Sequence, residues 1–125
     1  MIKITEKSRE FSKVEQYLMT VAPSIISAKD VEDGTKITVS GVLEFTDIKD
    51  DGTETEIMSI ITPDKAVYSC QSSTFKRSIH DIMEIMEGEP FTIVKTSGET
   101  KAGRDYINCV LDTDSIMGDT DRIKE

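Results

Sequence analysis

The side chains best suited to catalysis form no recognisable constellation in this sequence. His80 is the single histidine, and no cysteine, serine or second histidine stands at a spacing that would pair it with a nucleophile. Neither a P-loop nor a G-x-G-x-x-G motif is present. We therefore expect no catalytic residue, no cofactor and no enzymatic activity, and we interpret His80 as a solvated position on a helix.

The acidic segment 47–58 imitates a calcium-binding loop but lacks essential ligands. Asp51 and Gly52 occupy positions where a calcium-binding loop has a ligand and its glycine. However, Lys49 occupies a ligand position, and Met58 stands where the loop requires a bidentate glutamate. We expect a solvated hairpin there and no bound metal.

Cysteine usage indicates a reducing compartment, and hydropathy indicates a protein without a membrane-spanning segment. Cys70 and Cys109 are the only cysteines, and they lie in strand-like segments without C-x-x-C spacing. We favour a reduced, half-buried pair, with a disulfide or a metal site as the alternative. No apolar run approaches the ~18–20 residues that span a bilayer, and residues 1–10 lack the apolar stretch of a signal peptide. We expect a cytoplasmic protein without a membrane partner.

Three aromatic residues on predicted strands are suited to binding rather than catalysis. Phe45, Tyr68 and Tyr106 would offer rings on which the bases of a single-stranded nucleic acid stack. Tyr68 is the strongest of the three, because polar residues flank it and its hydroxyl needs water or a partner. A place in the core is the alternative for each ring.

The cations are concentrated locally in an acidic chain. The net charge of −9, from 24 acids and 15 bases, excludes a protein that binds polyanions by bulk charge. However, no acid lies between Lys65 and His80, and Glu99 is the only acid in 95–104. The candidate residues for binding single-stranded nucleic acid are Phe45, Lys49, Lys65, Tyr68, Lys76, Arg77, Lys95, Lys101, Arg104 and Tyr106.

The elements that position these residues begin with a short helix. Ser12 followed by Glu15 has the form of a capping box and predicts a helix over residues 12–21. From residue 36 the apolar period changes to two, which predicts a long strand, and Gly41 marks a bend within it.

The remaining pattern predicts a hairpin, one longer helix and two more strands. Glycine at position 52 favours a turn, and hydroxyl-bearing residues at 72–74 favour a helix start. An apolar stripe at helical spacing continues from Phe75 to Met86, and Gly88 ends that helix. The predicted strands after the bent one cover residues 53–62, 66–70, 91–95 and 104–111.

This order of elements predicts a mainly β fold. A helix between the third and fourth of five strands, with a bent first strand, is typical of an OB-fold-like Greek-key barrel. An open α+β sheet with one packed helix is the alternative. We expect an N-terminal extension with a short helix at 1–32, the OB-fold-like domain at 33–112, and an acidic C-terminal tail at 113–125.

A series of short pieces carries a resemblance to a known family. In order, they are Asp33-Gly34-Thr35, Phe45 before an acidic hairpin, residues 60–64, Val67-Tyr68-Ser69, Glu89-Pro90-Phe91, the loop 97–103 and Tyr106-Ile107. In this order they resemble the small single-stranded DNA-binding proteins of tailed bacteriophages, of the kind used in protein-primed replication. The resemblance implies stacking at Phe45 and Tyr68 and sequence-independent coating of displaced strands. It does not extend to residues 1–32.

Two functional hypotheses follow. The first is a non-enzymatic single-stranded DNA-binding protein of phage DNA replication, located in the host cytoplasm, whose acidic tail competes with DNA or recruits replication proteins. The second is a protein-binding module, such as a phage structural, adaptor or regulatory protein, that uses its N-terminal helix as the contact. The oligomeric state and the choice between DNA and RNA stay open at this point.

Overall fold

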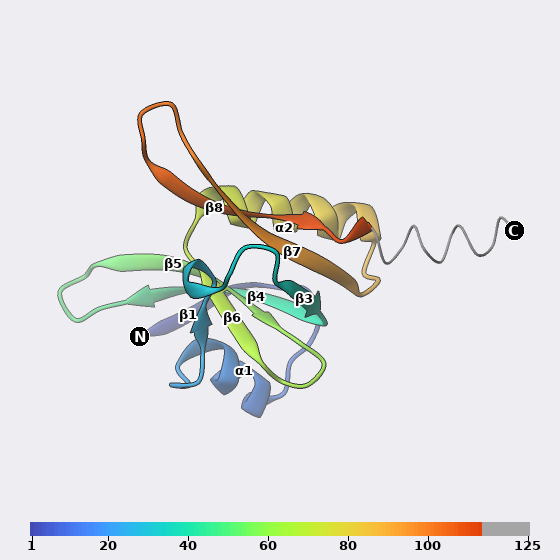
Figure 1. The fold of residues 1–125 in the computed structure, drawn as a ribbon. Coiled ribbons are helices and arrows are strands. Elements are labelled where there is room, and N and C mark those ends of the chain that lie inside the picture. Colours follow the sequence, from blue (N-terminus) through green and yellow to red (C-terminus); the bar gives the residue numbers. More distant parts are fainter. Residues whose placement is uncertain (114–125) are drawn as a thin grey trace, which may run out of the picture.

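The computed structural model describes residues 1–113, and these form a mainly β fold with two sheets and two α-helices (Figure 1). The elements in chain order are β1 (Ile2–Lys7), α1 (Lys13–Thr20), β2 (Ile26–Ser27), the 3-10 helix η1 (Ala28–Asp30), β3 (Lys36–Val39), β4 (Gly41–Ile48), β5 (Glu54–Ile61), β6 (Val67–Cys70), α2 (Ser73–Met86), β7 (Phe91–Glu99) and β8 (Asp105–Leu111). None of the helices in the described part is long and apolar enough to cross a membrane.

One bent segment connects the two sheets. The five-stranded sheet has the order β1-β4-β5-β6-β2, and the three-stranded sheet has the order β3-β7-β8. The chain leaves one sheet and enters the other between β3 and β4. The bend falls at Ser40, next to the predicted Gly41, and glycine is needed at 41 because a Cβ there would lie 2.6 Å from the buried Phe11 ring.

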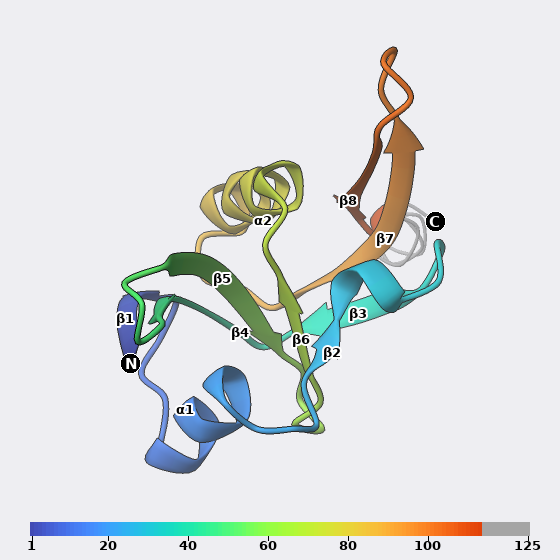
Figure 2. The same ribbon diagram turned by 90° about the vertical axis from the view of Figure 1, so that its left-hand side faces the viewer.

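The sheets of residues 1–113 do not close into a barrel, so the predicted five-stranded barrel is not confirmed. Closure would require β6 to pair with β8. That edge of the sheet is instead occupied by β2, which runs parallel to β6 with Ile26 opposite Tyr68 and Ser27 opposite Ser69. On the other side, β8 pairs only with β7. The two sheets therefore remain separate at this edge, as Figure 2 shows.

The N-terminal segment is packed into the same fold. β1 pairs antiparallel with β4, a strand that the short alternation at Ile2 and Ile4 did not reveal. The predicted capping box of α1 is confirmed, because Ser12 Oγ accepts from the Glu15 amide and Glu15 Oε1 accepts from the Ser12 amide. Met19 is fully buried, and its carbonyl accepts a hydrogen bond from Ser59 Oγ.

The predicted helix between the third and fourth expected strands is α2. Ser72 caps its start by accepting from the Phe75 amide at 3.2 Å. Phe75 and Ile79 of the predicted apolar stripe are fully buried in the core between α2 and both sheets. The helix ends at Met86 and is followed by two residues with left-handed backbone, the C-cap Glu87 and the predicted Gly88.

The two cysteines lie in that same core as free thiols. Cys70 and Cys109 are buried rather than half-buried, and burial raises the pKa of each thiol to about 12. Asp112, assigned to the end of the domain, is also buried, and its carboxylate lies 3.3 Å from Lys36 Nζ. Residues 114–125 of the predicted acidic tail lie outside the described residues.

Candidate nucleic-acid interface

A groove of about 840 Å³ lies between the β6–α2 connection and the β7–β8 hairpin. We call it the hairpin groove. In Figure 2, β6 rises into α2 on one side of this region, the β7–β8 hairpin stands on the other, and η1 lies below. The lining residues are Ser27, Lys29, Ser69, Cys70, Gln71, Ser72, Ser73, Thr74, Lys95, Ser97, Gly98, Asp105, Tyr106 and Ile107. The groove occupies the place where β6 and β8 do not pair.

The hydroxyl-rich connection 71–74 forms one wall and starts α2. Ser72 Oγ both caps the helix and donates a hydrogen bond to the Ile107 carbonyl of β8 at 3.3 Å. Ser73 and Thr74 follow in the first helical turn with exposed side chains. The free amides of a helix start favour an anionic group, and the neighbouring hydroxyls are neutral hydrogen-bond partners for one.

Tyr106 forms the opposite wall. Its ring lies directly over Gly98 on the neighbouring strand, because a Cβ on that glycine would stand 2.5 Å from Tyr106 Oη. The side chain remains 39% exposed. Because Gly98 has no side chain, the Tyr106 ring can pack against its backbone, and this contact holds the ring at the surface.

Lys29 on η1 adds a cation that the sequence patterns did not single out. It is exposed, lines the groove and forms no ion pair within the described residues. A lone lysine in the mixed polar segment 24–35 carries no signal of its own. Only the fold of β2 and η1 alongside β6 brings it to the groove.

Lys95 also lines the groove, but it is not available as a free cation. Only 5% of its side chain is exposed, and Nζ lies 2.9 Å from Asp33 Oδ1. Ser97 Oγ donates to the other oxygen of the same carboxylate. These hydrogen bonds from Ser97 and Lys95 lower the pKa of Asp33. The prediction that Lys95 tracks a phosphate is therefore wrong, since its charge is neutralised within the fold.

Phe45 cannot serve as a stacking surface either. Its ring is 3% exposed and packs with Phe11, Met19, Leu43 and Ile61 in the core beside α1. β4 lies inside the five-stranded sheet, and α1 covers the face to which this ring points. Phe45 is therefore a core residue, which was the alternative interpretation, and it is not part of the candidate interface.

Tyr68 is half-buried and belongs to a different hollow. Ser69 and Cys70 of β6 line the hairpin groove, whereas Tyr68 lines a separate hollow of about 400 Å³ with Lys36, Thr38 and Thr62. Tyr68 and Tyr106 therefore line two different hollows and do not form one stacking surface.

The predicted strip of cations is dispersed. Lys65 Nζ lies 2.9 Å from Glu15 Oε2, and Lys76 Nζ donates to the Glu56 carbonyl at 2.9 Å. Lys49 is exposed in the β4–β5 turn and is not among the residues that line the groove.

Three of the predicted cations remain exposed near the helix and the hairpin. Arg77 is on α2, and Lys101 and Arg104 are at the tip of the β7–β8 hairpin. None of the three forms an ion pair with another described residue. Of these cations, only Lys101 and Arg104 lie in the same hairpin as Tyr106. The β7–β8 hairpin therefore carries both a predicted stacking ring and predicted phosphate-binding cations.

The groove is lined by hydroxyl groups, one exposed aromatic ring and two lysines. It contains no histidine, and the Cys70 thiol has a pKa near 12, so it is not a nucleophile at neutral pH. Asp105 is its only acid apart from the Asp33 carboxylate that holds Lys95. Hydroxyls, an aromatic ring and a few cations are the chemistry of a recognition surface.

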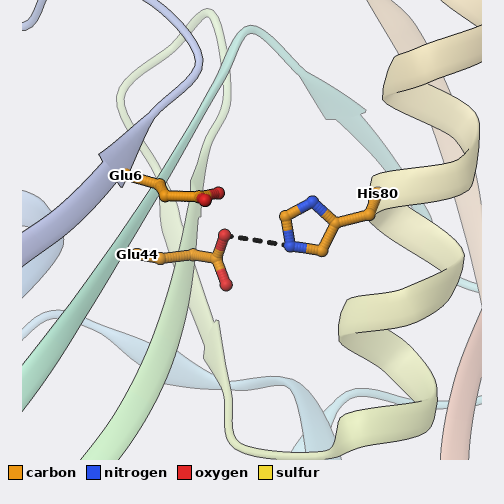
Figure 3. A group of neighbouring side chains, drawn as sticks. All are labelled: Glu6, Glu44 and His80. Carbon is orange, nitrogen blue, oxygen red and sulfur yellow. Dashed lines mark ion pairs between the residues drawn. The ribbon is translucent and has the colours of Figure 1, made fainter.

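A second group of polar side chains lies away from the groove, where α2 faces the five-stranded sheet. His80 Nε2 lies 2.9 Å from Glu44 Oε2, and Glu6 lies beside them (Figure 3). His80 therefore lies on a helix, as expected, but it also has an ion-pair partner. Its side chain is 41% exposed but paired with a carboxylate from another element.

Comparison of the chain with protein-family models, with curated proteins and with solved structures gave no match.

Proposed function

We propose that this protein binds single-stranded DNA without sequence preference through the hairpin groove. As the family resemblance of residues 33–112 implies, we further propose that it protects displaced strands during phage DNA replication. The observation that carries the proposal is the Tyr106 ring, which is seated on Gly98 and exposed on the wall of an open, hydroxyl-lined groove. A base stacked on such a ring gains ~1–3 kcal/mol whatever its identity.

The size and shape of the groove support a chain-like ligand. Its volume of about 840 Å³ lies within the range of sites that hold whole small molecules, and it is open rather than enclosed. A base with its sugar and phosphate can therefore enter while the strand continues on both sides. A paired base could not place its face on Tyr106, so the same geometry disfavours duplex DNA.

The electrostatics support a binder that depends more on stacking than on charge. The start of α2 and Lys29 favour a phosphate at the groove, and Lys101 and Arg104 favour another at the hairpin tip. Asp105 and the net charge of −9 oppose a polyanion. We expect binding of moderate affinity with a shallow dependence on salt.

The arrangement of strands supports an open variant of the OB-fold. The bent pair β3 and β4, the meander through β5 and β6, and α2 before β7 and β8 follow the order of that fold. We propose that β2 replaces β8 at the edge of β6 and holds the barrel open. In this arrangement the β7–β8 hairpin corresponds to the loop between the fourth and fifth strands, one of the two that contact ligands in OB-folds.

Titration of the full chain with oligo-dT tests the proposal directly. We expect saturable quenching of tyrosine fluorescence at low salt, because a stacked base quenches the ring and the chain has no tryptophan. The absence of quenching, together with unchanged anisotropy of a labelled oligonucleotide, would exclude the function.

A matched pair of tyrosine variants locates the interface. Tyr106→Ala should weaken binding of a labelled oligonucleotide by ~1–3 kcal/mol, the value of one stacked base. Tyr17 on α1 is 52% exposed and far from the groove in the fold, so Tyr17→Ala should leave the affinity unchanged. Equal losses in both variants would place DNA elsewhere than in the hairpin groove.

An exposed apolar face on α1 favours protein binding as a second candidate function. Val14, Tyr17 and Val21 are 68%, 52% and 56% exposed, and their spacing places them along one side of the helix. Replacing Val14 and Val21 by glutamine leaves the core residues of α1 in place. If the protein ignores oligonucleotides, loss of a stable protein complex in this variant would support the second function.

A further inference from the structure

Three side chains from three elements converge between α2 and the five-stranded sheet. Glu6 comes from β1, Glu44 from the neighbouring β4, and His80 from the middle of α2 (Figure 3). β1 and β4 are paired, with Glu6 directly opposite Glu44 in the register. The two carboxylates therefore lie side by side on one sheet face, and the imidazole approaches them from the helix.

The spacing of these groups suits one small ion. One ligand atom from each residue lies within 4.8 Å of the other two, and His80 Nε2 is already 2.9 Å from Glu44 Oε2. Tetrahedral zinc with bonds of about 2.0–2.2 Å places its ligand atoms about 3.3 Å apart. Small side-chain rotations would therefore bring all three atoms to coordination distance without movement of the backbone.

The charge of the cluster also favours a cation. No lysine or arginine in residues 1–113 forms an ion pair with Glu6 or Glu44. Glu44 is half-buried, and His80 is its ion-pair partner among the described residues. A divalent ion would neutralise both carboxylates, which a single imidazole cannot do.

We propose that Glu6, Glu44 and His80 form a zinc-binding site that clamps β1 and β4 to α2. One imidazole nitrogen with two carboxylate oxygens is a donor set that zinc accepts, with water in the fourth position. Calcium and magnesium favour sites made only of oxygen ligands, so the imidazole selects against them. The proposal revises the expectation of no metal and is independent of the hairpin groove, which shares none of these residues.

Isothermal titration of the chelator-treated full chain with zinc chloride tests the site. We expect one zinc ion per chain and no measurable binding of calcium or magnesium. His80→Ala and Glu44→Gln should each weaken zinc binding by at least ~10-fold, as loss of even an outer-sphere partner does. Asp81→Asn removes an exposed acid next to His80 in sequence, on another side of α2, and should leave the affinity unchanged.

Two readouts of the wild-type protein keep the proposal falsifiable if a variant fails to fold. His80 is the only histidine, so its ring signals in an NMR spectrum are unambiguous, and stoichiometric zinc should shift them. Cobalt in place of zinc should give a spectrum without a thiolate charge-transfer band. Unshifted His80 signals, or a thiolate band that assigns the metal to Cys70 or Cys109, would overturn the site.

Discussion

Two regions of the molecule use charged side chains in opposite ways. At the α1 end, Glu15 accepts hydrogen bonds from the Ser12 amide and lies 2.9 Å from Lys65 Nζ and 3.3 Å from Arg9 Nη2. These contacts lower the pKa of the Glu15 carboxyl to about 2, with the Ser12 amide as the largest cause. Arg9 and Lys65 are therefore both paired within the fold, through one carboxylate.

At the hairpin groove, the exposed cations have no such partners. Lys29, Lys101 and Arg104 are exposed and form no ion pair within the described residues, and the Tyr106 ring is 39% exposed beside them. Lys95 is the exception, because its burial requires the Asp33 carboxylate. A cation in a sequence is therefore evidence of a ligand site only after its partners in the fold are known.

The largest difference between the regions should appear in stability. Phe45→Ala opens a cavity in the core beside α1 and should lower the free energy of unfolding by ~3–5 kcal/mol. Tyr106→Ala removes only a cross-strand contact and should lower it by less than ~1 kcal/mol. Urea denaturation of both variants measures the contrast. Equal losses would mean that Tyr106 is a core residue and not a binding surface.

Gly98→Ala should disturb binding with little change in stability. The new Cβ would lie 2.5 Å from Tyr106 Oη, so the ring must move away from residue 98. We expect the affinity for oligo-dT to fall by up to ~1–3 kcal/mol, the value of the displaced stacking contact. The same substitution in a Tyr106→Ala background should add no further loss. An additive loss in the double variant would show that Gly98 acts independently of the ring.

The salt dependence should separate the paired cations from the unpaired ones. Replacement of Lys29, Lys101 or Arg104 by glutamine should each make the slope of log K against log salt shallower by ~0.7, the value of one phosphate contact on a single strand. Lys65→Gln should leave the slope unchanged, because Lys65 is paired with Glu15. A reduced slope in the Lys65 variant would contradict the assignment of the two regions.

The smallest effect concerns acid stability at the α1 end. The pKa of Glu15 is lowered from 4.5 to about 2, so its contribution is present above pH 4.5 and is lost as the pH falls toward 2. Glu15→Gln should be less stable than the wild type above pH 4.5, and the difference should shrink between pH 4.5 and 2. The change stays small because solvent screens exposed charges. Urea denaturation across this pH range measures it, and a constant difference would refute the linkage.

Sequence patterns were sufficient where the determining contacts are local. The Ser12–Glu15 capping box and the hydroxyl cap at Ser72 lie within three residues of the groups that they bind, so both helices were predictable. The alternation of β4 had already placed Phe45 on the same face as Leu43, and that face is buried.

The candidate sites depended on contacts between residues far apart in the chain. β1 exists because β4 pairs with it, and β2 occupies the edge of β6 that a closed barrel would use. Neither segment has a long enough alternation of apolar and polar residues to predict a strand from the sequence. The pairing of Lys95 with Asp33, and that of His80 with Glu44, likewise join positions that no motif relates.

By itself, the sequence determined a mainly β chain with two capped helices, an acidic net charge and no catalytic motif. The tertiary structure alone decided which aromatic ring is exposed, which cations are paired and where Glu6, Glu44 and His80 meet. The physical reason is the range of the interactions. Caps, turns and apolar periodicity act within a few residues, whereas sheet pairing and burial depend on which distant segments pack together.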